Sequence, residues 1–92
     1  MQHLKFDLGY QDRGAVVRVN LEGNAANVRL LDSSNYRSYQ RGEQHRCWGG
    51  NYTRSPAVLT VPNYGHWFIA VDYGGYAGRG RASVEVLSPQ GV

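Results

Sequence analysis

The sequence predicts an all-β fold, a small antiparallel β-sandwich of the jelly-roll kind with six to eight strands. Short segments of alternating apolar and polar residues recur along the chain, and Gly, Pro and Asn turns separate them at intervals of about 8–12 residues. The alternation of long helices with strands that marks an α/β fold is not found. The 92 residues correspond to one domain, 1–92, in which 88–92 is expected to form a frayed tail.

The strands follow from the alternation, taken in chain order. Gly23-Asn24 suits a tight connection and is expected to close an antiparallel hairpin between the second and third strands. The strand at 66–72 is apolar on both faces, so we expect it to be central and covered on both sides. The expected strands are 4–8, 15–21, 26–30, 57–61, 66–72 and 81–87, with a further edge strand or extended loop within 43–52.

One short helical turn is expected near 33–41. Asp32 and the residues after it are typical of helix N-caps, and Gly42 is typical of a helix end. Tyr36 and Tyr39 share one face of this turn at i, i+3 spacing. They fit either a lid packed on the sheet or a surface that contacts a ligand.

The charge is moderately positive, at +3 with a pI of about 9.3, and all basic residues except Lys5 are Arg. Guanidinium groups stack on aromatic rings and bind carboxylates or phosphates bidentately. The single cysteine, Cys47, excludes an internal disulfide. No N-terminal secretory signal and no apolar run near the ~18 residues of a membrane span are found. We therefore expect a cytoplasmic protein with no membrane partner.

Catalytic and cofactor motifs are weak, so we expect no enzyme activity, no metal and no cofactor. The chain has no G-x-S-x-G elbow, and its seven acidic residues are scattered. His45 and Cys47 supply two ligands, where a structural zinc site needs four. The glycine-rich loop at 74–80 leads into a strand and not into a helix N-terminus, so it is interpreted as a hairpin or bulged connection and not as a phosphate loop.

Arginine and aromatic side chains in two segments predict a binding surface for a small polar or anionic ligand. Trp48 lies in a segment without clean alternation and is expected to be exposed. The alternative is a protein-interaction or self-assembly adaptor that forms a homo-oligomer. Nucleic-acid binding is a lesser alternative, because the two long helices of an RNA-recognition fold are missing. The predicted ligand-binding residues are Arg41, His45, Arg46, Trp48, Tyr52, Tyr73, Tyr76 and Arg79.

Several motifs together resemble one family. They are GNAANVRLLDSSNYRSYQRGEQHR (23–46), the pairs Gly49-Gly50 and Ser55-Pro56, and VPNYGHWFIAVDYGGYAGRGRASVEV (61–86). The chain resembles the small bacterial domain-of-unknown-function family number 1883 over nearly its whole length. The resemblance implies a compact β-sandwich that occurs alone or joined to a TIR domain. It implies no catalytic residues.

Overall fold

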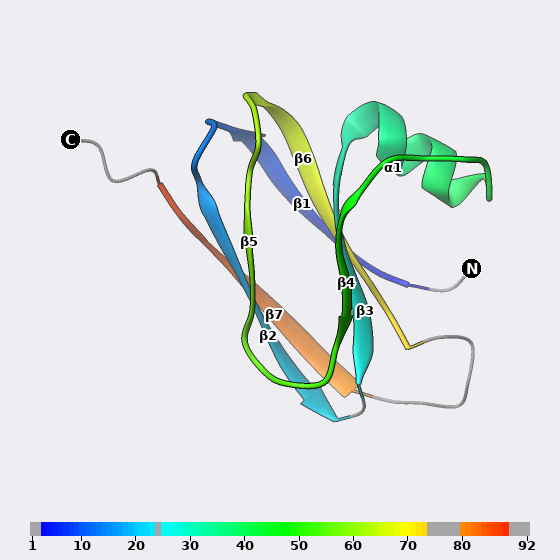
Figure 1. Ribbon diagram of the computed structural model, residues 1–92, viewed down its shortest axis with the longest axis vertical. Helices are drawn as coiled ribbons and strands as arrows, with labels where there is room; N and C mark the ends of the chain where they lie inside the picture. Colours follow the sequence, from blue (N-terminus) through cyan, green and yellow to red (C-terminus); the bar gives the residue numbers. More distant parts are fainter. Residues whose placement is uncertain (1–2, 24, 74–79, 89–92) are drawn as a thin grey trace.

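The computed structural model describes residues 3–23, 25–73 and 80–88, which form seven strands and one helix in three layers (Figure 1). Four strands form one antiparallel sheet in the order β1-β6-β3-β4, called sheet A, and three form sheet B in the order β5-β2-β7. The elements are β1 (Leu4–Gln11), β2 (Val16–Gly23), β3 (Ala26–Asp32), α1 (Ser33–Gln40), β4 (Trp48–Tyr52), β5 (Ala57–Thr60), β6 (Gly65–Asp72) and β7 (Gly80–Leu87).

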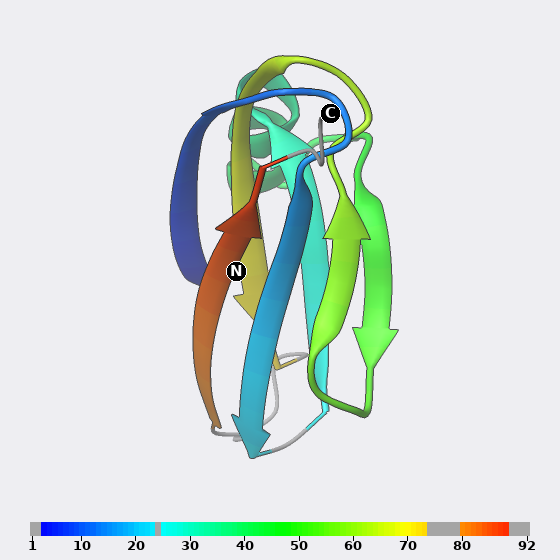
Figure 2. The ribbon, with the colours of Figure 1, turned by 90° about the vertical axis from the view of Figure 1, so that its left-hand side faces the viewer.

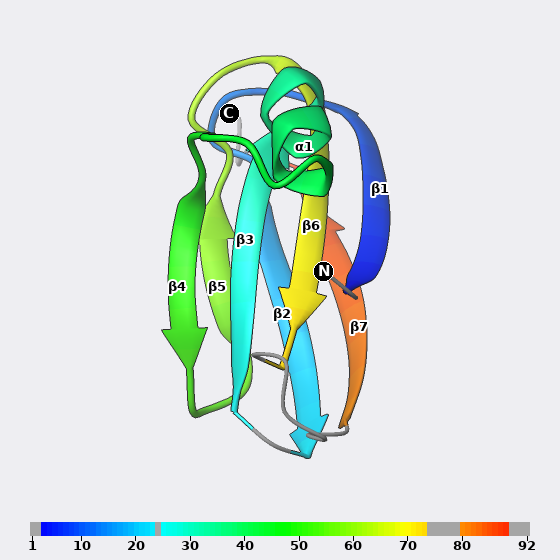
Figure 3. The ribbon, with the colours of Figure 1, turned by 90° about the vertical axis from the view of Figure 1, so that its right-hand side faces the viewer.

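The two sheets pack face to face, and the main core fills the space between them. Sheet B lies in front in Figure 2, and sheet A lies in front in Figure 3. The alternation along each strand sends every second side chain into this core, as expected for a sandwich. The fully or nearly fully buried members are Ala15, Val17, Val19, Ala26, Val28, Leu30, Ala57, Leu59, Val61, Trp67, Ile69 and Val71. The predicted all-β sandwich is confirmed.

Strand β6 is central, as its apolar sequence predicts. It pairs with β1 on one side and with β3 on the other. Trp67 and Ile69 point into the inter-sheet core, and burial of each contributes about 1.5–3 kcal/mol. Phe68 and Ala70 point to the outer face of sheet A and pack in a second cluster under α1. Both faces of β6 are therefore covered.

Helix α1 lies over the outer face of sheet A, in front of the upper parts of β3 and β6 in Figure 3. Asp32 caps its N-terminus by accepting a hydrogen bond of 3.0 Å from the Asn35 backbone N–H. Tyr36 and Tyr39 are buried against Leu31 of the sheet and its apolar neighbours. Of the two interpretations of these tyrosines, the lid packed on the sheet is correct.

Two predicted hairpins are wrong. Gly23-Asn24 does not close a hairpin, because β2 belongs to sheet B and β3 to sheet A. The loop before β7 does not join a hairpin either, since β6 and β7 also lie in different sheets. The physical reason is the same in both places. Each of these strands buries one face in the inter-sheet core, so successive strands cover that core from opposite sides.

Candidate functional site

The segment that follows α1 is fixed to the helix at both of its ends. At the C-terminus of α1, the Gly42 N–H donates to the Tyr39 carbonyl at 3.1 Å, and the Glu43 N–H donates to the Ser38 carbonyl at 2.9 Å. These two bonds form a Schellman motif, which satisfies the last carbonyls of the helix and reverses the chain. The chain then returns along the helix toward β4.

The return segment is tied to the first turn of the helix by Asn35. The Arg46 backbone N–H donates to Asn35 Oδ1 at 2.8 Å, and Asn35 Nδ2 donates to the capping carboxylate of Asp32 at 2.9 Å. Between these points, the His45 ring contacts the Tyr39 ring edge-on, with centroids 5.3 Å apart. The backbone that carries the predicted site residues 41–46 is therefore held in place.

Three arginines point into solvent from this unit: Arg37, Arg41 and Arg46. Arg41 lies 3.6 Å from Glu43, but both side chains are more than half exposed, so the ion pair adds little stability. Arg37 and Arg41 share a helix face at i, i+4 spacing. We call Arg37, Arg41, His45 and Arg46 the helix–return surface.

The other predicted site residues do not join this surface. Trp48 is half-buried, and its ring meets the Trp67 ring edge-on at 5.5 Å, so the expected exposed Trp48 is instead packed on the core. Tyr52 lies at the opposite end of β4 and also packs on the core. Tyr73 follows β6 near that same end, and its hydroxyl is buried without a hydrogen-bond partner among the described residues. Tyr76 and Arg79 lie outside the described residues.

A polar network centred on the buried Asp72 joins α1 to the outer face of sheet A, and the sequence pattern did not predict it. Asp72 is only 2% exposed and forms an ion pair with Arg29. Its carboxylate also accepts hydrogen bonds from the Tyr39 hydroxyl at 3.2 Å and from Asn27 Nδ2 at 3.0 Å. Asn51 extends the network across β4 by donating to Asn27 Oδ1 at 3.1 Å. The alternation that places Phe68 on the outer face of sheet A also places Asp72 on that face. It does not predict which side chains bind the Asp72 carboxylate.

The environment of the helix tyrosines favours their neutral form. Burial, followed by the negative charge of Asp72, raises the pKa of Tyr39 to about 12. Burial also raises the pKa of Tyr36. The Arg29 guanidinium lies over the Tyr39 ring, 5.2 Å from its centroid. These groups connect the helix to the sheet.

A second aromatic surface lies at the edge of sheet A, and the sequence analysis did not single it out. Tyr10 of β1 and Tyr64 of the turn before β6 are stacked, with centroids 5.9 Å apart and planes at 23°. The His66 ring lies 5.0 Å from Tyr10, and His66 Nε2 lies 2.7 Å from Asp7 Oδ1. The N–H of Gly9 and then His66 lower the pKa of Asp7, so this carboxylate is ionised at neutral pH.

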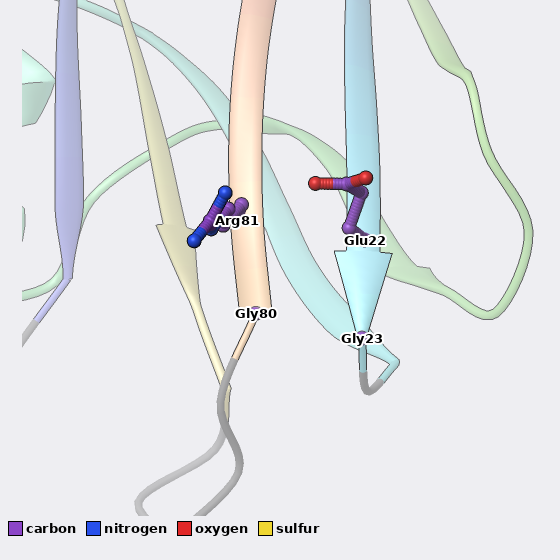
Figure 4. A pocket seen from close by; sticks show the side chains of 4 residues that line it. All are labelled: Glu22, Gly23, Gly80 and Arg81. Atoms are coloured by element: carbon purple, nitrogen blue, oxygen red, sulfur yellow. The ribbon is translucent and has the colours of Figure 1, made fainter.

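A shallow pocket, drawn in Figure 4, lies at the end of the sandwich that is opposite to α1 in Figure 1. It is lined by Glu22 and Gly23 of β2 and by Gly80 and Arg81 of β7, which pair across sheet B. The pocket is open to solvent and its two charged side chains have opposite sign. Neither feature selects a ligand charge.

We also searched the described residues for a metal-binding group and for a membrane-spanning helix. Within 3–23, 25–73 and 80–88, no group of three or more His, Cys, Asp or Glu side chains is placed to hold a metal ion. In the same part of the chain, no helix has the length and apolarity that crossing a bilayer requires.

The fold and surfaces define a small all-β sandwich domain with one helix packed on an outer sheet face. Residues 1–90 match the protein-family model described as "Domain of unknown function (DUF1883)". The chain therefore belongs to this family, as its sequence motifs indicated. No curated protein and no solved structure matches the chain.

Proposed function

We propose that this domain is a non-catalytic recognition module that binds a polar or anionic ligand on the helix–return surface. The observation that carries the proposal is the combination of exposed guanidinium groups with a fixed backbone. Arg46 is exposed, yet its backbone N–H is held by Asn35. Arg41 is exposed and follows directly on a capped helix. A surface that is ordered before binding loses less entropy when a ligand docks.

The charge of the surface favours an anion. Arg37, Arg41 and Arg46 carry three positive charges, and Glu43 is the exposed acid among them. Guanidinium groups form paired, charge-assisted hydrogen bonds with carboxylate or phosphate oxygens. His45, which packs on Tyr39, adds a ring beside these charges. A ligand with a carboxylate or phosphate group and a planar portion has the chemistry that this surface recognises.

The proposed site is narrower than the set predicted from the sequence. Trp48, Tyr52 and Tyr73 pack against the inter-sheet core, so they support the fold and are not part of the proposed site. Arg41, His45 and Arg46 remain as proposed contacts, and Arg37 joins them through its helical spacing. Tyr76 and Arg79 stay predicted contacts, because they lie outside the described residues.

The non-catalytic part of the proposal is supported by the chemistry of the buried polar groups. Asp72 is surrounded by donors from Arg29, Tyr39 and Asn27, which suits a structural carboxylate. The pKa of Tyr39 is raised and not lowered, so its hydroxyl stays protonated at neutral pH and is a poor base.

An amide NMR titration tests the proposal. Isotope-labelled protein is titrated with nucleotides, cyclic nucleotides and poly-glutamate peptides. We expect localised shifts at Arg41, His45 and Arg46 that weaken as salt is added, because exposed charges are screened. Arg41→Ala and Arg46→Ala are each expected to weaken binding about tenfold, as loss of a charge-assisted hydrogen bond does, with little change in melting temperature.

Arg54→Ala is the matched control for this titration. Arg54 is also an exposed arginine, but it follows the far end of β4. It should bind the anionic probe as the parent chain does. An equal loss of affinity in Arg54→Ala and Arg46→Ala would show that binding depends only on the net charge of the protein. That result would contradict a defined site. Absence of shifts at 41–46 with every probe would also remove the proposal.

Self-assembly through a sheet edge is the second candidate function. Strand β7 is eight residues long, pairs with β2 on one side, and has no bulge in its register. Long flat edges offer unpaired backbone groups to another chain, although Arg81 and Glu85 are charges of the kind that protect an edge. Sedimentation velocity over a wide concentration range tests this candidate. A sedimentation coefficient that does not change with concentration would eliminate it.

The proposal includes a bacterial, cytoplasmic setting. Cys47 is exposed and is the chain's single cysteine, and a free surface thiol suits a reducing compartment. Cell fractionation with an antibody to the chain tests this location, and recovery from an oxidising compartment would contradict it.

A further inference from the structure

Two exposed tyrosines form one continuous surface at the edge of sheet A. Tyr10 is 67% exposed and Tyr64 is 65% exposed, and their rings stack on each other. Single exposed apolar side chains are ordinary on protein surfaces, whereas contiguous exposed apolar surface is a feature of interaction sites. The patch of Tyr10 and Tyr64 lies on β1 and the turn before β6, and the helix–return surface lies on other elements.

A bulge in β1 directs Tyr10 to the outer face. Leu8 packs against the inter-sheet core, and regular alternation would send Tyr10 to the same side. The register shift between Asp7 and Gly9 reverses the direction of the side chains that follow it. Tyr10 therefore lies opposite His66 on the outer face. Gly9 has φ of +70°, a conformation that glycine adopts at little cost. The chain thus exposes a ring that a regular strand would have buried.

The neighbouring contacts hold the patch in place. The Trp67 indole N–H donates to the Asn63 carbonyl at 2.9 Å, which fixes the turn that carries Tyr64. On the β1 side, His66 Nε2 lies 2.7 Å from Asp7 Oδ1. Both rings therefore stand on a rigid base with a carboxylate and an imidazole beside them, which is the preorganisation that a binding site requires.

We infer that the stacked Tyr10–Tyr64 pair binds a neutral saccharide on its outward ring face. The hydrogens on the face of a sugar ring carry partial positive charge, and the face of a tyrosine ring is negative, so the two attract. Asp7 and His66 lie beside the rings and can bond sugar hydroxyls. The ionised Asp7 carboxylate repels phosphate, which argues against a nucleotide at this place. Glucose-type rings, whose hydroxyls are all equatorial, offer the most C–H surface to such a ring face.

The test is an amide NMR titration of the whole chain with cellohexaose, chitohexaose and maltohexaose. We expect localised shifts at Tyr10, Tyr64 and His66 with at least one of these saccharides. Tyr10→Ala and Tyr64→Ala should each weaken that binding about tenfold, which is the loss expected for one stacked ring. Their melting temperatures should stay close to that of the parent chain, because both side chains are exposed.

Val58→Ala is the matched control, because Val58 is a 54% exposed apolar residue on sheet B. It should bind the saccharide as the parent chain does. Absence of shifts at Tyr10 and Tyr64 with all three saccharides overturns the inference, and so do shifts that both alanine variants retain. Shifts at these residues with adenosine monophosphate alone overturn it as well. Binding of an anionic probe at Arg41 and Arg46 would neither support nor contradict saccharide binding at Tyr10 and Tyr64. The two proposals are therefore tested independently.

Discussion

Tyr39 joins the helix to the sheet through its hydroxyl, which makes stability sensitive to alkaline pH. Its pKa rises from 10.0 to about 12 on folding, so the folded state holds the phenolic proton more tightly than the unfolded state. The stability that the neutral hydroxyl contributes is fully present below pH 10 and is lost as pH rises through 12. We expect the free energy of unfolding to fall across this window, by up to about 1.4 kcal/mol for each pH unit.

Urea unfolding followed by tryptophan fluorescence at a series of alkaline pH values measures this slope. Tyr39→Phe is the comparison, since it keeps the ring and removes the ionisable group. The variant should be less stable at neutral pH, because the hydrogen bond to Asp72 is lost, and its alkaline slope should be shallower. Parallel slopes for the two proteins would show that other groups cause the alkaline loss.

Two glycines with positive φ differ in what a side chain would meet, which separates backbone strain from crowding. Gly9 has φ of +70° with no atom near an added Cβ, whereas an added Cβ at Gly49 would collide with the Val28 carbonyl. Gly9→Ala should therefore lower the free energy of unfolding by about 1 kcal/mol, because of the backbone conformation alone. Gly49→Ala should cost about 3 kcal/mol, because β4 must also move away from β3. Urea unfolding measures both, and equal costs would contradict this assignment.

At the scale of elements, α1 depends on its cap because a helix of eight residues is not stable alone. Asp32→Ala removes the side chain that accepts from Asn35 and should lower stability by about 1 kcal/mol. Hydrogen exchange should quicken in α1 and in the return segment before it does so in β6. Ser34→Ala is the control, because Ser34 is exposed and its bond to Asp32 is 3.3 Å long. Equal effects of the two changes would rule out a specific cap.

Strand β4 lies at the edge of sheet A, and Trp48 attaches it to the core. Its ring meets the Trp67 ring at 5.5 Å, so removal opens a space beside a fully buried side chain. Trp48→Ala should lower the free energy of unfolding by about 3 kcal/mol, near the low end for large aromatic residues because Trp48 is only half-buried. Thermal and urea unfolding measure the loss. An unchanged melting temperature would instead return Trp48 to the set of free binding residues.

At the scale of the molecule, the sequence predicted the elements well and their partners poorly. Alternation and capping are local signals, so the strands around Val17 and Ile69 and the helix after Asp32 could be predicted. Sheet membership is not local: Gly23 ends a strand of sheet B, and nothing beside it in sequence shows that the next strand lies in sheet A. Pairing is decided by which faces are buried together.

The site was predicted in part for the same reason. The arginines near Arg46 lie in a polar segment, and polar segments are exposed, so their exposure follows from sequence. Trp48 is followed by two glycines, which carry no side chains to show an alternation. The sequence therefore could not predict whether the Trp48 side chain points into the core or into solvent. The outward direction of Tyr10 could not be predicted because of the bulge at Gly9. A bulge reverses which face the following side chains point to, and the apolar–polar alternation of the sequence does not show where this happens.

The topology also predicts slow folding. The strand pairs are β1–β6, β2–β5, β2–β7, β3–β4 and β3–β6, and even β3 and β4 are separated by α1. Each pairing must close a long loop before its contacts form, so refolding should take on the order of milliseconds to seconds. Stopped-flow tryptophan fluorescence measures the rate, and refolding in microseconds would contradict the argument.

Two variants show which part of the sandwich forms first. Strand β6 joins β1 to β3 and faces both clusters, so the barrier to folding should include its pairing. Ile69→Val, which costs about 1 kcal/mol, should then slow folding. Asp32→Ala should chiefly speed unfolding, because α1 docks onto the face that β6 and β3 have already formed. If Ile69→Val changes the unfolding rate alone, the sheet does not assemble around β6.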